Sequence, residues 1–178
     1  VDRKVTGAPV QVYESAARMR AGFEKATLYS FGVVLLFLLI ELRSLRLALL
    51  AMVPLSMGLL WLLEALPLLG IDFNLANFFA LPILIGCGVD GGVHMVHRFR
   101  ESGSAVSVGK TTAAAVTLSF LTTMIGFGAM ATASHQGVAS LGLMMISGLF
   151  CILTATVILL PALLKLLEKK QTAIPPRS

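Results

Sequence analysis

The sequence contains few charged residues. Only 13% of its 178 residues are Asp, Glu, Lys or Arg, whereas soluble globular domains average about 25%. Hydrophobic residues make up 57% of the chain. Too few charged residues are present to cover the surface of a water-soluble globular domain. The composition therefore excludes an ordinary soluble domain and indicates a lipid bilayer as the surrounding medium.

Cysteine and clustered chemical groups are also scarce. Cys87 and Cys151 both fall in apolar stretches, where a free thiol behaves as a small hydrophobic side chain, and we assign them no function. The sequence contains no nucleophile beside a base, no metal-ligand cluster and no Gly-rich phosphate loop followed by Lys, so we expect neither an enzyme nor a metal or organic cofactor. The net charge of +5 does not predict nucleic-acid binding, because the basic residues stand at the ends of apolar stretches.

Five long apolar stretches dominate what is present. Each approaches or exceeds the roughly 20 residues that a membrane-spanning helix needs. The predicted spans are about 26–42, 46–69, 77–98, 112–133 and 138–166. The sequence therefore predicts an all-α membrane protein with five transmembrane helices in a bundle over residues 25–168, followed by a cytoplasmic tail at 169–178.

The basic residues predict the orientation of these spans. They follow the first, third and fifth spans, at Arg43 and Arg46, at Arg98, Arg100 and Lys110, and at Lys165, Lys169, Lys170 and Arg177. The alternate connections, 70–76 and 134–137, contain no Lys or Arg. The positive-inside rule then places the N-terminal segment outside and the C-terminus inside.

Residues 1–24 are predicted to form the end of an extracytoplasmic domain and an amphipathic helix leading into the membrane. The segment 5–10 has the character of a short strand or turn, and after it Val12, Tyr13, Ala16, Met19 and Phe23 recur at helical spacing. The alternative is an interfacial helix lying on lipid. An odd number of spans that begins outside, with no removable leader, predicts that another membrane segment precedes this one.

Asp90 is an acidic residue within a predicted membrane span, so its position there requires an explanation. It stands near the centre of the third span, where a carboxylate costs on the order of 3 kcal/mol on insertion scales. A low-dielectric medium favours the neutral form of a carboxyl group, so Asp90 could load and release a proton as its surroundings change. The alternative is a permanently protonated or hydrogen-bonded Asp that only holds helices together.

His94 lies one helical turn after Asp90 on the same face, which makes an Asp–His proton relay geometrically feasible. His97 follows at seven residues from Asp90 and could contribute. Both histidines also approach the membrane surface, so an interfacial position is the alternative reading. No metal is implied, because one helix face offers no further acids or cysteines as ligands.

Small and hydroxyl-bearing residues accompany the acid. Gly88 and Gly92 form a small-xxx-small pair beside Gly91, which permits either close helix packing or local bending near the carboxylate. Polar or small residues also follow one stripe of the fourth span, at Thr112, Ala115, Ser119, Thr122, Thr123 and Gly126. The mid-span members Ser119, Thr122 and Thr123 could hydrogen-bond Asp90 or a water, or serve only in helix packing.

Other polar residues and prolines have simpler expected roles. Glu64 stands near the outer end of the second span, and Asn74 and Asn77 are expected to cap the start of the third. The prolines expected to kink their helices are Pro54, Pro82 and Pro161, although Pro161 could instead mark the last turn of the fifth span.

Several short motifs, in this order, resemble the resistance-nodulation-division (RND) superfamily, in the MMPL branch of mycobacterial large membrane proteins and hydrophobe exporters. They stand at 5–9, 42–44, 53–55, 86–90 with His94 and 97–101, 121–128 and 160–163. Within this branch, the sequence motif around Asp90 most resembles that of the hopanoid-biosynthesis-associated transporters. Mycobacterial members of the family place Tyr after this Asp, whereas Gly91 follows it here.

This resemblance implies that the chain is the C-terminal transmembrane half, helices 8–12, of a transporter in a bacterial inner membrane. It implies export of a lipid or hydrophobic substrate, with hopanoids as one candidate, driven by the proton gradient through Asp90. The implied partners are the lipid bilayer, the preceding N-terminal half, the substrate and a further copy of the protein in a homo-oligomer. Two alternatives remain open: an auxiliary subunit of protein secretion, similar to the secretion members of the superfamily, and a lipid sensor similar to sterol-sensing domains.

Overall fold

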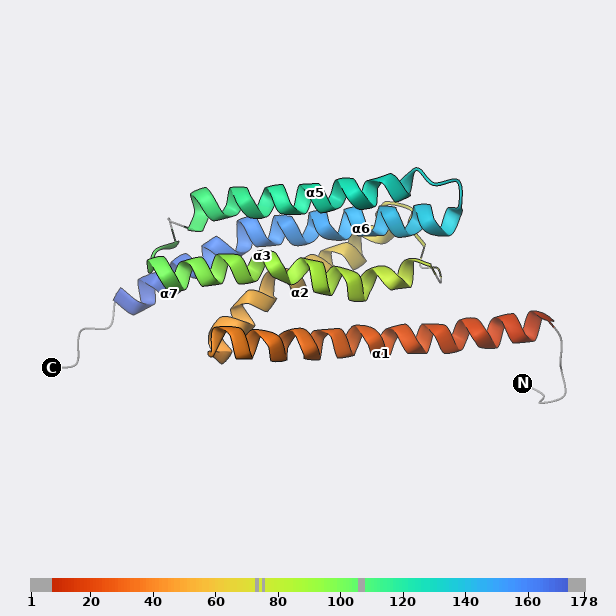
Figure 1. The fold of residues 1–178 in the computed structure, drawn as a ribbon, viewed down its shortest axis with the longest axis horizontal. Coiled ribbons are helices and arrows are strands. Elements are labelled where there is room, and N and C mark those ends of the chain that lie inside the picture. Colours follow the sequence, from red (N-terminus) through yellow and green to blue (C-terminus); the bar gives the residue numbers. More distant parts are fainter. Residues whose placement is uncertain (1–7, 73, 75, 106–107, 173–178) are drawn as a thin grey trace.

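The computed structural model describes residues 8–72, 74, 76–105 and 108–172, and helices form nearly all of this part of the chain (Figure 1). The helices are α1 (Ala8–Leu42), α2 (Leu45–Leu68), η1 (Asn77–Phe79), α3 (Ala80–Ser102), η2 (Val108–Thr112), α5 (Ala113–Ala131), α6 (Gln136–Thr154), η3 (Ala155–Leu159) and α7 (Leu160–Thr172). Here η1 is a 3-10 helix, and η2 and η3 are π-helical turns.

Five helices among the described residues are long and apolar enough to cross a membrane, which confirms the predicted fold class. They span Ala17–Leu42, Leu45–Leu68, Asn77–Ser102, Ala113–Ala131 and Gln136–Lys169. The last combines α6, η3 and α7. The predicted ends differ from these by a few residues, except at the start of the first span, where α1 continues far beyond the apolar stretch.

The expected strand or turn over residues 5–10 is wrong where it can be compared, because α1 already includes Ala8, Pro9 and Val10. Proline is well tolerated in the first helical turn, where its missing N–H has no helical partner in any case. Residues 5–7 lie outside the described residues. The lead-in segment and the first span form one unbroken helix.

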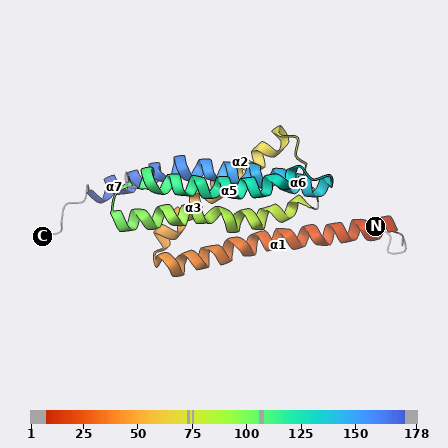
Figure 2. The same cartoon turned by 45° about the horizontal axis from the view of Figure 1, so that its top comes forward.

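The helices α2, α3 and α6 form the centre of the bundle, and α1 and α5 lie on opposite sides of α3 (Figures 1 and 2). In the most apolar windows of the central spans, 44–50% of residues are buried, compared with 11% for the first span and 17% for the fourth. The outer helices therefore leave much apolar surface for lipid or for another part of a larger protein.

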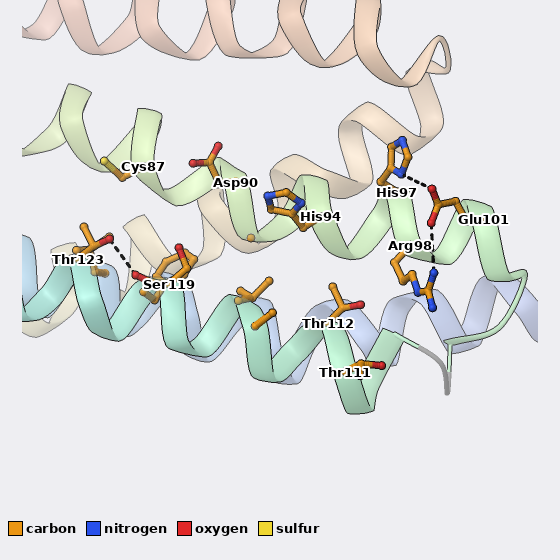
Figure 3. A pocket seen from close by; sticks show the side chains of 15 residues that line it. Cys87, Asp90, His94, His97, Arg98, Glu101, Thr111, Thr112, Ser119 and Thr123 are labelled. Atoms are coloured by element: carbon orange, nitrogen blue, oxygen red, sulfur yellow. Dashed lines mark hydrogen bonds and ion pairs between the residues drawn. The ribbon is translucent and has the colours of Figure 1, made fainter.

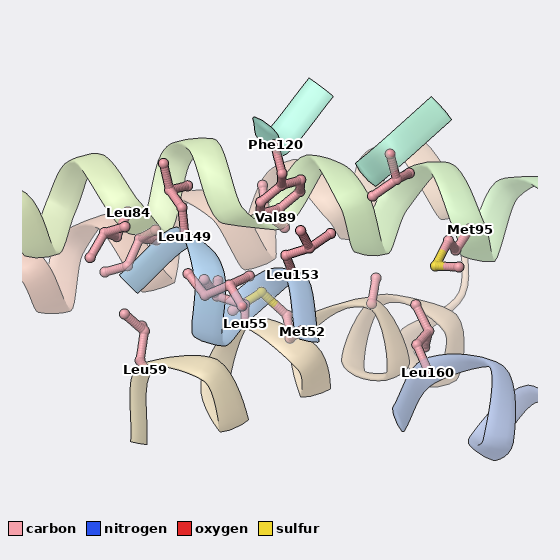
Figure 4. Packing of buried hydrophobic residues seen from close by; sticks show 14 of the residues in the cluster. Met52, Leu55, Leu59, Leu84, Val89, Met95, Phe120, Leu149, Leu153 and Leu160 are labelled. Carbon is pink, nitrogen blue, oxygen red and sulfur yellow. The ribbon is translucent and has the colours of Figure 1, made fainter. Parts of the chain in front are cut away.

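The core is built from aliphatic side chains and methionines of the central helices, joined by Phe120 of α5 and Leu160 of α7 (Figure 4). Glycines bring the helix backbones close together, as is common in membrane proteins. A Cβ atom on Gly58 of α2 would lie 2.5 Å from Cα of Ile152 in α6, and one on Gly92 of α3 would clash with the backbone oxygen of Ala51 in α2. Close backbone contact thus fixes α2 against both α3 and α6.

A hydrogen-bonded cluster holds one end of the bundle together. The Asn74 side-chain oxygen accepts hydrogen bonds from the backbone N–H groups of Ala76 and Asn77, both at 3.0 Å, so it satisfies the first N–H group of η1. The N-cap position itself is Ala76, and Asn77 is the first residue of η1 and not its cap. The Asn77 side-chain oxygen in turn accepts from the Asn74 N–H at 2.9 Å. Both amide groups donate to the hydroxyl of Ser140 in α6, at 2.7 and 2.9 Å. Asn77 is fully buried by this arrangement.

The opposite end carries the basic connections. Arg100 of α3 donates to the backbone oxygen of Leu42 at 3.2 Å, so it caps the end of α1. The carboxylate of Glu168 in α7 accepts from the Ala105 N–H at 3.1 Å. These contacts join the ends of α1, α3 and α7, so the described connections rich in Lys and Arg meet at one end, as the charge alternation predicts.

Prolines affect the helices unequally. Pro54 and Pro67 lie within α2, which remains a single helix, and Pro82 stands in the first turn of α3. Pro161 directly follows the π turn η3 and Leu160. A proline inside a helix removes one backbone hydrogen bond and clashes with the preceding turn, so a wider turn just before Pro161 relieves that clash.

Candidate proton-relay site

A cleft of about 620 Å³ lies between α3 and the segment formed by η2 and α5 (Figure 3). From α3 it is lined by Cys87, Asp90, Gly91, His94, His97, Arg98 and Glu101, and from the other side by Thr111, Thr112, Ala115, Val116, Ser119, Phe120 and Thr123, with Leu149 of α6. One wall therefore carries the ionisable groups and the other carries hydroxyl and apolar groups.

Asp90 lies midway along α3, with ten residues of the helix before it and twelve after it. Its side chain is exposed within the five-helix bundle and borders the cleft. The helices of this bundle therefore do not enclose the Asp90 carboxyl group. The physical reason is that α2 and α6 pack against the glycine face of α3, while the Asp90 face is left open between the outer helices.

The structure brings His94 and His97 to the same cleft as Asp90. His94 is exposed on the next helical turn. His97 pairs with Glu101, with 3.3 Å between its Nδ1 atom and Oε1 of the acid. Arg98 reaches the other oxygen of Glu101 at 3.4 Å. Sequence reasoning missed Glu101 as a site residue, although its four-residue spacing from His97 was a readable signal.

The three predicted glycines do not share one face. Gly91 lines the cleft, and a Cβ atom there would lie 2.9 Å from the Phe120 ring and 3.1 Å from a methyl group of Thr156. Gly88 lies against Leu55 and Ile152, and Gly92 lies against α2. Gly91 thus borders the cleft, whereas Gly88 and Gly92 allow close packing on the opposite side.

The predicted hydroxyl stripe of the fourth span is also divided. Ser119 and Thr123 line the cleft, and the Thr123 hydroxyl donates to the Ser119 backbone oxygen at 2.9 Å. The Thr122 hydroxyl donates to the backbone oxygen of Leu118, and Thr122 is not among the residues that line the cleft. Thr112 and Ala115 complete the lining toward η2.

The π turn η3 lies beside this site and was not foreseen from the sequence. Its buried Thr156 is the residue whose methyl group approaches Gly91, and its hydroxyl donates to the Ile152 backbone oxygen at 2.8 Å. Such turns often stand at functional sites in helices. The only local signal for it is the proline at position 161.

A carboxyl group and two imidazoles that line one cleft can take up, hold and release protons. Within the part of the chain that the structure describes, no three His, Cys, Asp or Glu side chains are grouped to hold a metal ion. This arrangement makes the cleft along the open face of α3 a candidate proton-handling site.

Comparison with known proteins identifies the family. The sequence profile of the MMPL family matches residues 2–178. The chain is 33% identical over 159 residues to the hopanoid transporter HpnN of Rhodopseudomonas palustris (strain TIE-1), and 32% identical over 158 residues to HpnN of Burkholderia multivorans (strain ATCC 17616 / 249). Each match covers 89% of this chain and 18% of the relative. On the strength of a match over nearly its whole length, this multi-pass membrane chain belongs to the MMPL family.

Proposed function

We propose that this chain is part of an exporter of lipids or other hydrophobic molecules, driven by the proton gradient across a bacterial inner membrane. The observation that carries the proposal is the position of Asp90, midway along a membrane-spanning helix and open to a cleft that also contains two histidines. The two HpnN relatives are named hopanoid transporters, which makes hopanoids a candidate substrate class. Their names also favour a transporter over an enzyme, a secretion subunit or a lipid sensor.

In the proposed mechanism, Asp90 alternates between its neutral and ionised forms. Neutral Asp90 tolerates an apolar environment, whereas the carboxylate requires water or a positive partner. Each change therefore alters which surface the Asp90 face of α3 can pack against, and this shifts the balance between two arrangements of the transporter. His94 passes the proton along the cleft, and Ser119, Thr123 and Gly91 provide its polar and narrow surroundings.

The open side of the bundle suggests where the rest of the transporter binds. The chain spans only 18% of the length of each HpnN relative. A preceding half of the same protein would cover the Asp90 face and could supply a second ionisable group. We further propose that the basic end of the bundle, which includes Arg43 and Arg100, is cytoplasmic and that the N-terminal segment is periplasmic. Association into a homo-oligomer would use the apolar outer surfaces of α1 and α5.

The test is substrate export by full-length protein carrying Asp90→Asn, with Glu64→Gln as a control acid exposed on α2. Asp90→Asn keeps the size of the side chain but removes its titration, so we expect export to stop while the protein still reaches the membrane. An uncoupler should stop export by the unmodified protein in the same way. Normal export by the Asn variant, with unchanged pH dependence, would refute the proposal.

A further inference from the structure

The ionisable residues of the cleft form a line along α3. Asp90, His94, His97 and Glu101 follow one another at intervals of four, three and four residues, so each stands about one helical turn after the last, and all of them line the same cleft (Figure 3). The line begins mid-helix at Asp90 and ends one residue before α3 ends at Ser102. It covers roughly 16 Å at 1.5 Å per residue.

The outer members of this line stand near the C-terminal end of α3 and are partly exposed. The side chains of His97 and Glu101 are 39% and 52% exposed, and their ring nitrogen and carboxylate oxygen are 3.3 Å apart. Arg98, 48% exposed, adds a positive charge 3.4 Å from the second carboxylate oxygen. An exposed imidazole paired with a carboxylate can exchange protons with the solvent on one side and with the cleft on the other.

Water can connect the inner and outer members. Successive residues of the line rise about 4.5–6 Å along the helix. His97 and Glu101 are in direct contact at 3.3 Å, whereas a bridging water would carry the proton from Asp90 to His94 and from His94 to His97. The cleft volume of about 620 Å³ is enough for on the order of twenty waters at ~30 Å³ each. The hydroxyls of Thr112 and Ser119 on the facing wall offer them further hydrogen-bond partners.

Among the described residues that line the cleft, the charged groups all belong to α3. In this lining, η2, α5 and α6 contribute hydroxyl-bearing, aliphatic and aromatic side chains, and no acid, base or imidazole. Arg98 is the one fixed positive charge in this lining. No other described group of the lining competes with His97 and Glu101 for the proton that leaves His94.

We propose that His97 and Glu101 form the port through which the proton on Asp90 exchanges with water at the C-terminal end of α3. This inference rests on the proposed function, because it assumes that Asp90 titrates, and it adds the route by which the proton travels. It also gives a role to the contact between His97 and Glu101.

Proton release takes place in single steps along this route. The neutral Asp90 carboxyl breaks its O–H bond, and through a bridging water an N–H bond forms on His94, leaving a carboxylate and an imidazolium. His94 then releases a proton from its other ring nitrogen through the next water to His97. His97 passes a proton to Glu101 or directly to solvent. Each step moves one proton and no electrons, and loading of Asp90 is the reverse sequence.

The test follows the protonation of Asp90 after a rapid pH change, by time-resolved infrared spectroscopy of the full-length protein. The carboxyl C=O band that is lost in Asp90→Asn identifies the Asp90 signal. In Glu101→Gln and His97→Gln we expect this band to change about tenfold or more slowly, because a fixed proton carrier contributes factors of this size or larger. The final amplitude of the band at each pH should stay close to that of the unmodified protein.

Two controls separate a port from a structural role. Glu24→Gln also removes an acid from an exposed pair, with Arg20 at 3.1 Å, but it lies on α1 outside the cleft and should leave the rate unchanged. Imidazole added to the buffer should restore the rate in His97→Gln and Glu101→Gln, because a mobile carrier replaces the fixed one, and Glu101→Asp should retain most of the rate.

The outcomes are distinct from those of the transport experiment. Unchanged rates in both port variants, or lowered rates that imidazole fails to restore, would overturn the port while leaving Asp90 as the coupling residue. A changed final amplitude with a normal rate would also overturn it, because the pair would then only adjust the electrostatics of the cleft. Refutation of the proposed function itself would appear instead as normal export by the Asp90→Asn variant.

Discussion

Replacing Gly58 by alanine should force apart the two central helices α2 and α6. The added Cβ atom would lie 2.5 Å from Cα of Ile152 and 2.7 Å from its backbone nitrogen, whereas ordinary contact begins at 3.4 Å. The helices must therefore separate by roughly 0.7–0.9 Å at this point, as the differences between these distances require. Because both obstructing atoms belong to the backbone, no side-chain rotation can relieve the contact.

The expected cost follows from two opposing effects. Overpacking of a well-packed core costs about 1–3 kcal/mol in the free energy of unfolding. The higher helix propensity of alanine returns at most about 1 kcal/mol. If the full propensity gain applies, we therefore expect Gly58→Ala to lower the free energy of unfolding by up to about 2 kcal/mol, and Gly58→Ala to be less stable by about 1–3 kcal/mol than an alanine variant without the contact.

The assay is thermal unfolding of the purified full-length protein in detergent, and Gly86→Ala is the matched control. Gly86 also lies inside a membrane-spanning helix, but a Cβ atom there would meet nothing within 4 Å. The control should melt at the same temperature as the unmodified protein or above it. If Gly58→Ala melted as high as Gly86→Ala, the close backbone contact between α2 and α6 would be refuted.

The remaining predictions concern the same core and the outer end of the bundle. In Gly88→Ala the new Cβ atom would lie 2.8 Å from the flexible Cδ1 atom of Ile152, so adding Ile152→Val should partly restore the melting temperature. The same second substitution should not restore Gly58→Ala, because there the obstructing atoms belong to the backbone. Equal rescue of both variants would contradict the backbone clash at Gly58. Asn77→Leu removes the amide that donates to Ser140 at 2.9 Å and to the Asp72 backbone oxygen at 2.8 Å. We expect it to lower the free energy of unfolding by about 1–3 kcal/mol. An unchanged melting temperature would show that this cluster contributes no stability. Thr156→Val keeps the shape of the side chain but loses its hydrogen bond to the Ile152 backbone oxygen, so a loss of about 1 kcal/mol is expected, and equal stability would mean that this oxygen is satisfied without it.

Much of the fold could be predicted because the membrane imposes simple requirements on length and polarity. Four of the five spans begin and end within a few residues of their predicted limits. The helical spacing from Val12 onward also predicted the lead-in helix, but the turn-forming residues near Pro9 suggested a break, so the first residues of α1, which begins at Ala8, were not predicted as helical.

The site was harder to predict, because periodicity shows which residues share a face but not what packs against that face. Asp90 and His94 do share a face, as their spacing required. Gly88 and Gly92, in contrast, have different neighbours from Gly91. They pack against α2 and α6, whereas Gly91 borders the cleft, and the sequence does not show where α2 and α6 lie. Glu101 was overlooked although its spacing from His97 was visible, because charged residues near a span end usually report only the membrane surface.

The π turn η3 shifts the angular register of every side chain that follows it. An α-helix rotates about 100° per residue, and a π turn contains one residue more than its α-helical equivalent. A helical wheel drawn from Gln136 through Thr172 would therefore misplace the side chains after Leu159 by about one position. For the same reason, deletion of a single residue within 155–159 should convert the bulge to a regular helix, so this is where the fifth span can best accept a one-residue gap.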